Sequence, residues 1–132
     1  MSGLMLRGTR SDRFIKTTDD LAVALSRLAR ECQDEGRLGL FEMKSQSGFV
    51  LGMVLGGTES ALSFGRADGE PPYFASEGTA SDDEPVLVAY LDLHHHTELP
   101  RWSVISIELA IDAAKEFLET GVRPTRVGWR EA

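Results

Sequence analysis

The residues best suited by type to do chemistry are three consecutive histidines, His94, His95 and His96. A zinc site needs several imidazole or thiolate ligands that converge on one point. Adjacent residues of an extended segment point to opposite sides, so at most His94 and His96 can act together. No cysteine pair and no His-x-x-x-His spacing supplies further ligands. We therefore expect surface or structural histidines, and neither a metal nor another cofactor.

The remaining candidate motifs lack the spacing that their chemistry requires. Cys32 falls among apolar residues at helical spacing, which predicts a buried small hydrophobic side chain rather than a nucleophile. The run Asp82-Asp83-Glu84 has neither the ligand order nor the central glycine of a calcium loop. Gly56-Gly57-Thr58 is not followed by the Gly-Lys-Ser/Thr of a phosphate loop. No residue can be assigned a catalytic role, and we expect a binding protein rather than an enzyme.

Acidic side chains are concentrated in residues 67–100. The chain has 132 residues and a formal net charge of -7, from 21 acidic and 14 basic side chains. Residues 67–100 contain no lysine or arginine but hold these acids: Asp68, Glu70, Glu77, Asp82, Asp83, Glu84, Asp92 and Glu98. Phosphate contacts require lysine and arginine, so this segment is not expected to bind nucleic acid. It is suited to a basic protein partner, whose opposite charge would speed association, or it forms a solvated loop that aids solubility.

Two aromatic residues, Tyr73 and Phe74, lie inside this acidic segment. Aromatic anchors surrounded by charge are typical of protein interfaces. The alternative is an edge strand that packs inward. Trp102 and Trp129, which flank the last predicted helix, are expected to pack in the core, and the alternative is that they are binding anchors. The candidate partner-binding residues are Asp68, Glu70, Tyr73, Phe74, Glu77, Asp82, Asp83 and Glu84.

Two helices are predicted to position these segments. The first covers residues 17–36, with Thr17 and Asp20 as a capping box and Gly36 at its end. The second covers residues 106–120, from a Ser106 cap to a stop at Gly121 and Pro124.

The strands are predicted from alternating and β-branched runs. They cover residues 38–46, 49–55, 61–65, an edge strand at 73–75, a central strand at 85–93, and short strands at 102–105 and 126–129. Residues 76–84 and 94–100 are expected to be polar connections. Because the connections are too short for parallel crossovers, we expect an α+β fold: an antiparallel meander sheet of about five to six strands with two helices packed on one face.

The length favours a single domain over residues 1–132, with residues 1–16 as a loose lead-in that includes at most a short strand near residues 13–15. No apolar run reaches the ~18–20 residues of a membrane span. The basic start, Met1 to Lys16, is not followed by the apolar segment of a secretory signal. We therefore expect a cytoplasmic protein without a membrane partner, which is a monomer or weak dimer when free.

The segment from Ser106 to Trp129, SIELAIDAAKEFLETGVRPTRVGW, resembles the C-terminal signature of immunity protein family one of bacterial polymorphic toxin systems. The similar features are Glu116-Phe117, Thr120-Gly121, Arg123-Pro124 and a closing Val127-Gly128-Trp129. Upstream, Leu62-Ser63-Phe64-Gly65 and Pro72-Tyr73-Phe74 are similar to the middle of that family.

This resemblance implies a small antidote that binds a cognate toxin domain and inhibits it. Members of the family are similar to inhibitors of nucleic-acid-targeting toxins, such as cytosine deaminases, whose basic active-site groove an acidic surface would cover. Gly121, Pro124 and Trp129 are expected to be a structural signature. The alternative is a small ligand-binding or enzymatic α+β domain with a pocket between sheet and helices.

Overall fold

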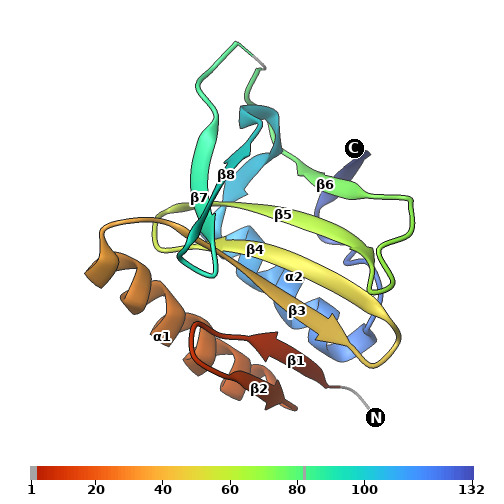
Figure 1. Ribbon diagram of the computed structural model, residues 1–132. Helices are drawn as coiled ribbons and strands as arrows, with labels where there is room; N and C mark the ends of the chain where they lie inside the picture. The colour runs from red at the N-terminus through yellow and green to blue at the C-terminus, as the bar shows by residue number, and fades with distance from the viewer. Residues whose placement is uncertain (1–2, 82) are drawn as a thin grey trace.

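A computed structural model describes residues 3–81 and 83–132 of the chain. Ten strands and two α-helices follow one another along it (Figure 1). Their bounds are β1 Leu4–Arg7, β2 Asp12–Ile15, α1 Thr18–Glu35, β3 Gly39–Ser45, β4 Phe49–Leu55, β5 Glu59–Arg66, β6 Phe74–Glu77, β7 Leu87–Leu91, β8 His95–Leu99, a 3₁₀ turn Arg101–Ser103, β9 Val104–Ser106, α2 Ile107–Thr120 and β10 Gly128–Glu131. The expected α+β class is confirmed, but ten strands replace the expected five to six.

Both helices begin and end where their capping residues predicted. The Thr17 hydroxyl accepts a hydrogen bond from the Asp20 amide at 3.1 Å, and the Ser106 hydroxyl accepts one from the Leu109 amide. These hydroxyls satisfy amides that have no partner inside the first turn of a helix. Gly36 and Gly121 end the helices in the left-handed conformation, with φ values of 69° and 72°.

The sheet is open, and its main path runs β10-β6-β5-β4-β3-β1-β2. Among the described residues, all its pairings are antiparallel except one: β7 pairs in parallel with the first two residues of β3. This pairing is possible because β1 covers only the second half of that edge of β3. From there β7 continues into a hairpin with β8, which rises away from the sheet in Figure 1.

Two separate cores lie on opposite faces of the central strands. In β4, Met53 belongs to the main core and the next residue, Val54, to the smaller one. This follows from the alternation of side chains along a strand. The main core takes side chains from both helices, including the fully buried Phe117, so both helices cover one face as expected. The smaller core places Leu87 and Ala89 of β7 against the other face.

Three expectations for individual strands are wrong. Residues 73–75 were expected at an edge, but β6 is hydrogen-bonded on both sides, to β5 and to β10. Residues 85–93 were expected at the centre, yet β7 is mostly paired with β8, and Val88 is exposed. Its β-branched residues favour an extended backbone wherever the strand lies. Residues 94–100 contain β8, whose polar side chains suit an outer strand that faces solvent.

The N-terminal segment is also more ordered than expected from its composition. Residues 4–15, within the expected loose lead-in, form a hairpin in which β1 pairs with both β2 and β3. Leu4, Leu6 and Ile15 are buried in the main core. Five apolar side chains in this polar segment, in two short clusters, gave too weak a pattern for a strand pair. Within the described ranges, neither α1 nor α2 combines the length and apolar character needed to cross a membrane.

Candidate partner-binding surface

The strand β6 divides the predicted partner-binding residues into two groups, one at each of its ends. Asp68, Glu70 and Tyr73 lie in the connection from β5 to β6. Glu77 is the last residue of β6, and Asp83 and Glu84 follow in the loop towards β7. Phe74 is the first residue of β6. The eighth predicted residue, Asp82, lies outside the described residues.

In the first group, local contacts fix the turn between β5 and β6. The Asp68 carboxylate accepts a hydrogen bond from the Glu70 amide at 3.0 Å and forms an ion pair with Arg66. The amide of Glu70, and then Arg66, lower the pKa of Asp68 below its ordinary value. The Tyr73 hydroxyl donates to the Gly69 carbonyl, while 48% of the Tyr73 residue remains exposed. The Tyr73 ring is therefore fixed in position and exposed to solvent.

Phe74 is directed elsewhere, into a shallow groove of about 580 Å³ between the C-terminal loop and β5. It shares this groove with Phe49, Phe64 and Trp129. The guanidinium of Arg123 lies 4.4 Å from the centre of the Phe74 ring, which is a cation–π contact. Phe74 is half-buried, as the alternative of an inward-packed strand predicted, whereas Tyr73 is not.

Glu77 and Glu84 of the second group line a larger groove of about 620 Å³, which we call the glutamate groove. Three glutamates line it: Glu59 from the start of β5, Glu77 from the end of β6, and Glu84 from the following loop. The apolar lining comes from Ala80, Pro85, Val104, Ile105 and Leu109. The groove is therefore assembled from three stretches of chain that are far apart in the sequence.

Gly78 determines how closely the loop after β6 approaches the wall of the glutamate groove. The Gly78 amide donates a hydrogen bond of 2.6 Å to the Trp102 carbonyl. A Cβ atom at Gly78 would collide with the carbonyl oxygen of Val104, well inside van der Waals contact. Only glycine fits this approach, because a backbone atom cannot move aside as a side chain can.

Two arginines hold glutamates of this groove. Arg101, with a side chain only 19% exposed, donates to Glu59 Oε1 at 3.0 Å and to the Pro85 carbonyl at 2.8 Å. Arg130 pairs with Glu77 at 2.8 Å and stacks on the Trp102 ring at 4.0 Å. Because these contacts hold the carboxylates in place, the groove wall is ordered before any partner binds.

Much of the negative charge counted in residues 67–100 is neutralised by bases from other parts of the chain. Besides Asp68 and Glu77, Asp92 pairs with Arg7 at 3.3 Å. Glu98 lies 3.8 Å from His96 of the same segment, which is an ion pair only when the imidazole is protonated. Among the described residues, Glu70, Asp83 and Glu84 have no ion-pair partner. The unpaired charge is thus smaller than the sequence count and lies mostly in the two groups beside β6.

The histidines and Cys32 have structural surroundings. His94, His95 and His96 are exposed, in the turn before β8 and in β8 itself. The ring of His96 packs edge-on against Tyr90 with 5.5 Å between centres. Cys32 is fully buried in the main core, as predicted, and burial raises the pKa of its thiol above the ordinary value of 9.0.

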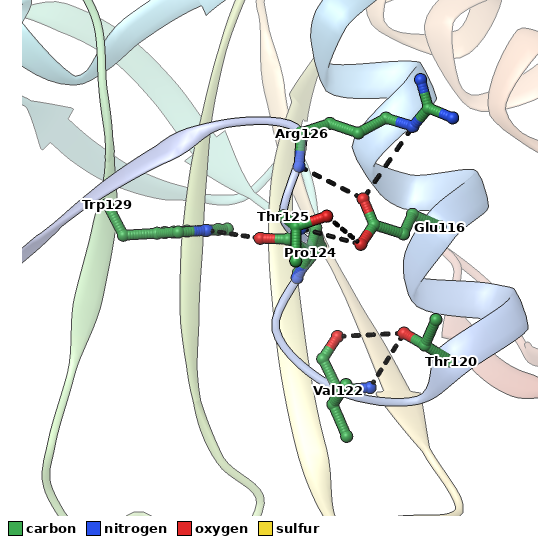
Figure 2. Close-up of polar contacts among 7 residues, drawn as sticks. All are labelled: Glu116, Thr120, Val122, Pro124, Thr125, Arg126 and Trp129. Atoms are coloured by element: carbon green, nitrogen blue, oxygen red, sulfur yellow. Dashed lines mark hydrogen bonds and ion pairs between the residues drawn. The ribbon is translucent and has the colours of Figure 1, made fainter.

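Figure 2 shows how the C-terminal segment is fastened to α2. The Glu116 carboxylate accepts hydrogen bonds from the Thr125 amide and hydroxyl, both at 2.8 Å, and from the Arg126 amide at 3.2 Å. Burial raises the pKa of Glu116, but these hydrogen bonds outweigh it and the pKa lies below its ordinary value. The Trp129 indole donates to the Pro124 carbonyl at 2.8 Å, so the chain is held on both sides of the loop after Gly121.

Sequence reasoning missed three residues of these sites. Glu59 and Arg101 are 42 positions apart, and nothing in their local patterns pairs them. Glu116 was present among the family-like features, but a glutamate at that position did not by itself show that its half-buried carboxylate binds the next loop. For Glu59 and Arg101 only the strand pairing of β5 with β9 brings the two ends together.

A comparison with protein families matches residues 9–131 to the family described as Immunity protein Imm1. The matched range includes both groups beside β6, the glutamate groove and the Glu116 network. The search of curated proteins gave no matching relative.

Proposed function

The chain belongs to the Imm1 family of immunity proteins, and from this premise we propose that it protects a cell by binding a cognate toxin domain and blocking its action. The family match carries the proposal, because it extends over nearly the whole chain. The activity expected of such a protein is binding without turnover, in the cytoplasm of the cell that it protects.

We further propose that the toxin acts on nucleic acid, as a cytosine deaminase does, and that the chain covers its basic groove. Enzymes that bind nucleic acid use lysine and arginine to hold phosphates. The net charge of -7 favours approach of the chain to such a surface. Glu70, Asp83 and Glu84, which have no ion-pair partner in the described ranges, supply exposed charge. Glu70 lies in the same connection as the exposed ring of Tyr73, whereas Asp83 and Glu84 follow the other end of β6. The predicted interface also includes Asp82.

The alternative, a ligand pocket between sheet and helices, receives less support. Most of that space is occupied by the main core, in which Phe41, Met53 and Phe117 are fully buried. A groove of about 310 Å³ remains between the β1–β2 hairpin and α1. The two grooves of the candidate partner-binding surface lie at the rim of the sheet instead. A surface for a protein partner is consistent with rim grooves, because interfaces place anchors in shallow depressions surrounded by polar groups.

The first experiment is co-expression of this chain with the toxin domain encoded beside it, followed by co-purification. Protection of the cells and recovery of a complex are expected. If the cells die and the two proteins do not associate, the proposed function is wrong.

The second experiment tests the role of acidic charge in association. The double variant Asp83→Lys/Glu84→Lys should associate more slowly than the parent chain, with a weaker dependence on salt. The double variant Asp34→Lys/Glu35→Lys makes the same charge change at the exposed end of α1 and serves as the control. Equal association rates for the two variants would remove Asp83 and Glu84 from the interface.

A further inference from the structure

The glutamate groove combines three properties that together specify a chemical class of occupant. It is concave, its lining is apolar, and carboxylates stand on its sides. Leu109 and Ile105 come from the wall formed by α2 and β9, and Ala80 and Pro85 come from the loop opposite. A lysine or arginine side chain matches this pattern, because it has an aliphatic stem and a cationic head.

The charge of the groove favours a cation. Three glutamates line it, and Arg101 and Arg130 pair with two of them, which leaves one carboxylate in excess. The N-terminus of α2 also meets the groove at Ser106, and a helix N-terminus carries roughly half a positive charge. That partial charge is smaller than the excess of carboxylates, and the Ser106 hydroxyl already satisfies the Leu109 amide at 3.2 Å.

Glu84 is the carboxylate available for a new ion pair. Glu59 and Glu77 are bound to Arg101 and Arg130, whereas Glu84 has no ion pair or hydrogen bond from its side chain to any described residue. Glu59 and Glu77 are therefore held in place and can accept further hydrogen bonds from a cation. Glu84 is the group whose charge an incoming cation would neutralise. Gly78, with its 2.6 Å hydrogen bond to the Trp102 carbonyl, keeps the loop that carries Glu84 close to the opposite wall.

We infer that the glutamate groove receives a lysine or arginine side chain of the toxin, with its stem against Leu109 and Ile105 and its cationic head beside Glu84 and Glu77. This inference rests on the proposed function for the identity of the partner. The chemistry of the groove is independent of the proposed function, and a small molecule can test that chemistry without the toxin.

The first test is a titration of the full chain with arginine amide, followed by amide chemical shifts in ¹⁵N-resolved NMR. Saturable shifts are expected at Gly78, Thr79 and Leu109, and they should be lost in Glu84→Gln. Citrulline amide, which has the same size and α-amino group but a neutral side chain, is the control. Equal shifts with both compounds, or shifts spread over the surface without saturation, would overturn the inference whether or not a toxin binds.

The second test uses the toxin domain encoded beside the chain. Ala80→Trp fills the groove without a change of charge and should weaken binding about tenfold or more, as loss of a central anchor does. Ala22→Trp, on the outer side of α1, is the matched control and should bind as the parent chain does. Glu84→Gln keeps the shape of the groove and should weaken binding several-fold.

The outcomes of the two tests separate the two ideas. If the parent chain binds the toxin and Ala80→Trp binds equally well with an unchanged melting temperature, the groove is not the contact, while the proposed function stands. If the parent chain neither binds nor protects, the proposed function fails, and the arginine amide titration alone decides what the groove accepts.

Discussion

Replacing Glu116 with glutamine removes the charge that fastens the C-terminal loop to α2. The carboxylate accepts three hydrogen bonds from Thr125 and Arg126. A glutamine has one acceptor oxygen, so two of these hydrogen bonds can remain but lose the charged acceptor. The third is lost, because its N–H donor then faces the NH₂ group of the glutamine. Hydrogen bonds to charged groups contribute about 1.5–3 kcal/mol each and neutral ones about 1 kcal/mol.

The expected loss in the free energy of unfolding is about 2 kcal/mol, because the donors can partly reach water once the bond is lost. For a domain of this size that loss lowers the melting temperature by about 6 °C. Urea unfolding followed by tryptophan fluorescence measures it, since Trp129 donates to Pro124 in the same loop. Glu119→Gln, an exposed position on the same helix, is the control and should change stability by less than about 0.5 kcal/mol.

The pH dependence of the free energy of unfolding gives a second, independent test of the Glu116 contacts. The pKa of folded Glu116 lies below its ordinary value of 4.5, so the folded state binds this proton less readily than the unfolded state. The stabilisation is present above pH 4.5 and is lost as the pH falls through the folded pKa. The difference between the parent chain and Glu116→Gln should therefore narrow in acid. A difference that stays constant with pH, or equals that of Glu119→Gln at pH 7, would refute the reasoning.

Three further predictions concern buried polar groups and aromatic packing. The Ser76 hydroxyl is fully buried, accepts from the Leu62 amide at 2.9 Å and donates to the Ser103 carbonyl at 2.6 Å; Ser76→Ala should cost about 2–3 kcal/mol in urea unfolding, and a loss below 0.5 kcal/mol would contradict the assignment. Trp129→Phe keeps a ring near Phe64 but removes the indole donor, so a loss of about 1 kcal/mol is expected, smaller than for Trp129→Ala. Cys32 should react with iodoacetamide only after unfolding in urea, because its thiol is buried and its pKa is raised; rapid labelling of the folded chain would be inconsistent with that burial.

The parts of the fold that depend on local signals could be predicted from the sequence. The capping residues Thr17 and Ser106, and the glycines that end each helix, gave both helices within a residue or two. The strand Phe49–Leu55 was predicted with the bounds that it has, because it is a continuous apolar run between two glycine turns.

The parts that depend on distant pairing could not be predicted. Nothing local in β10 indicates that it pairs with β6 and makes it an inner strand. The exposed β8, His95–Leu99, carries no apolar alternation, since only its backbone and one face meet the rest of the chain. Likewise, the acid count of residues 67–100 did not include Arg7 and Arg130, which the fold brings to Asp92 and Glu77.

Few contacts attach the β7–β8 hairpin to the sheet. It has a two-residue pairing with β3, the small core around Leu87 and Ala89, and the guanidinium of Arg37 stacked 4.0 Å from the Tyr90 ring. Regions with few buried apolar contacts open before the rest of a protein unfolds. Amides of β7 and β8 should therefore exchange with deuterium sooner than those of β4. Pro85, which lines the glutamate groove, lies two residues before the start of β7, so each such opening would loosen one wall of the groove. An occupant that stabilises this wall would therefore slow hydrogen exchange in the hairpin, although it does not contact the hairpin.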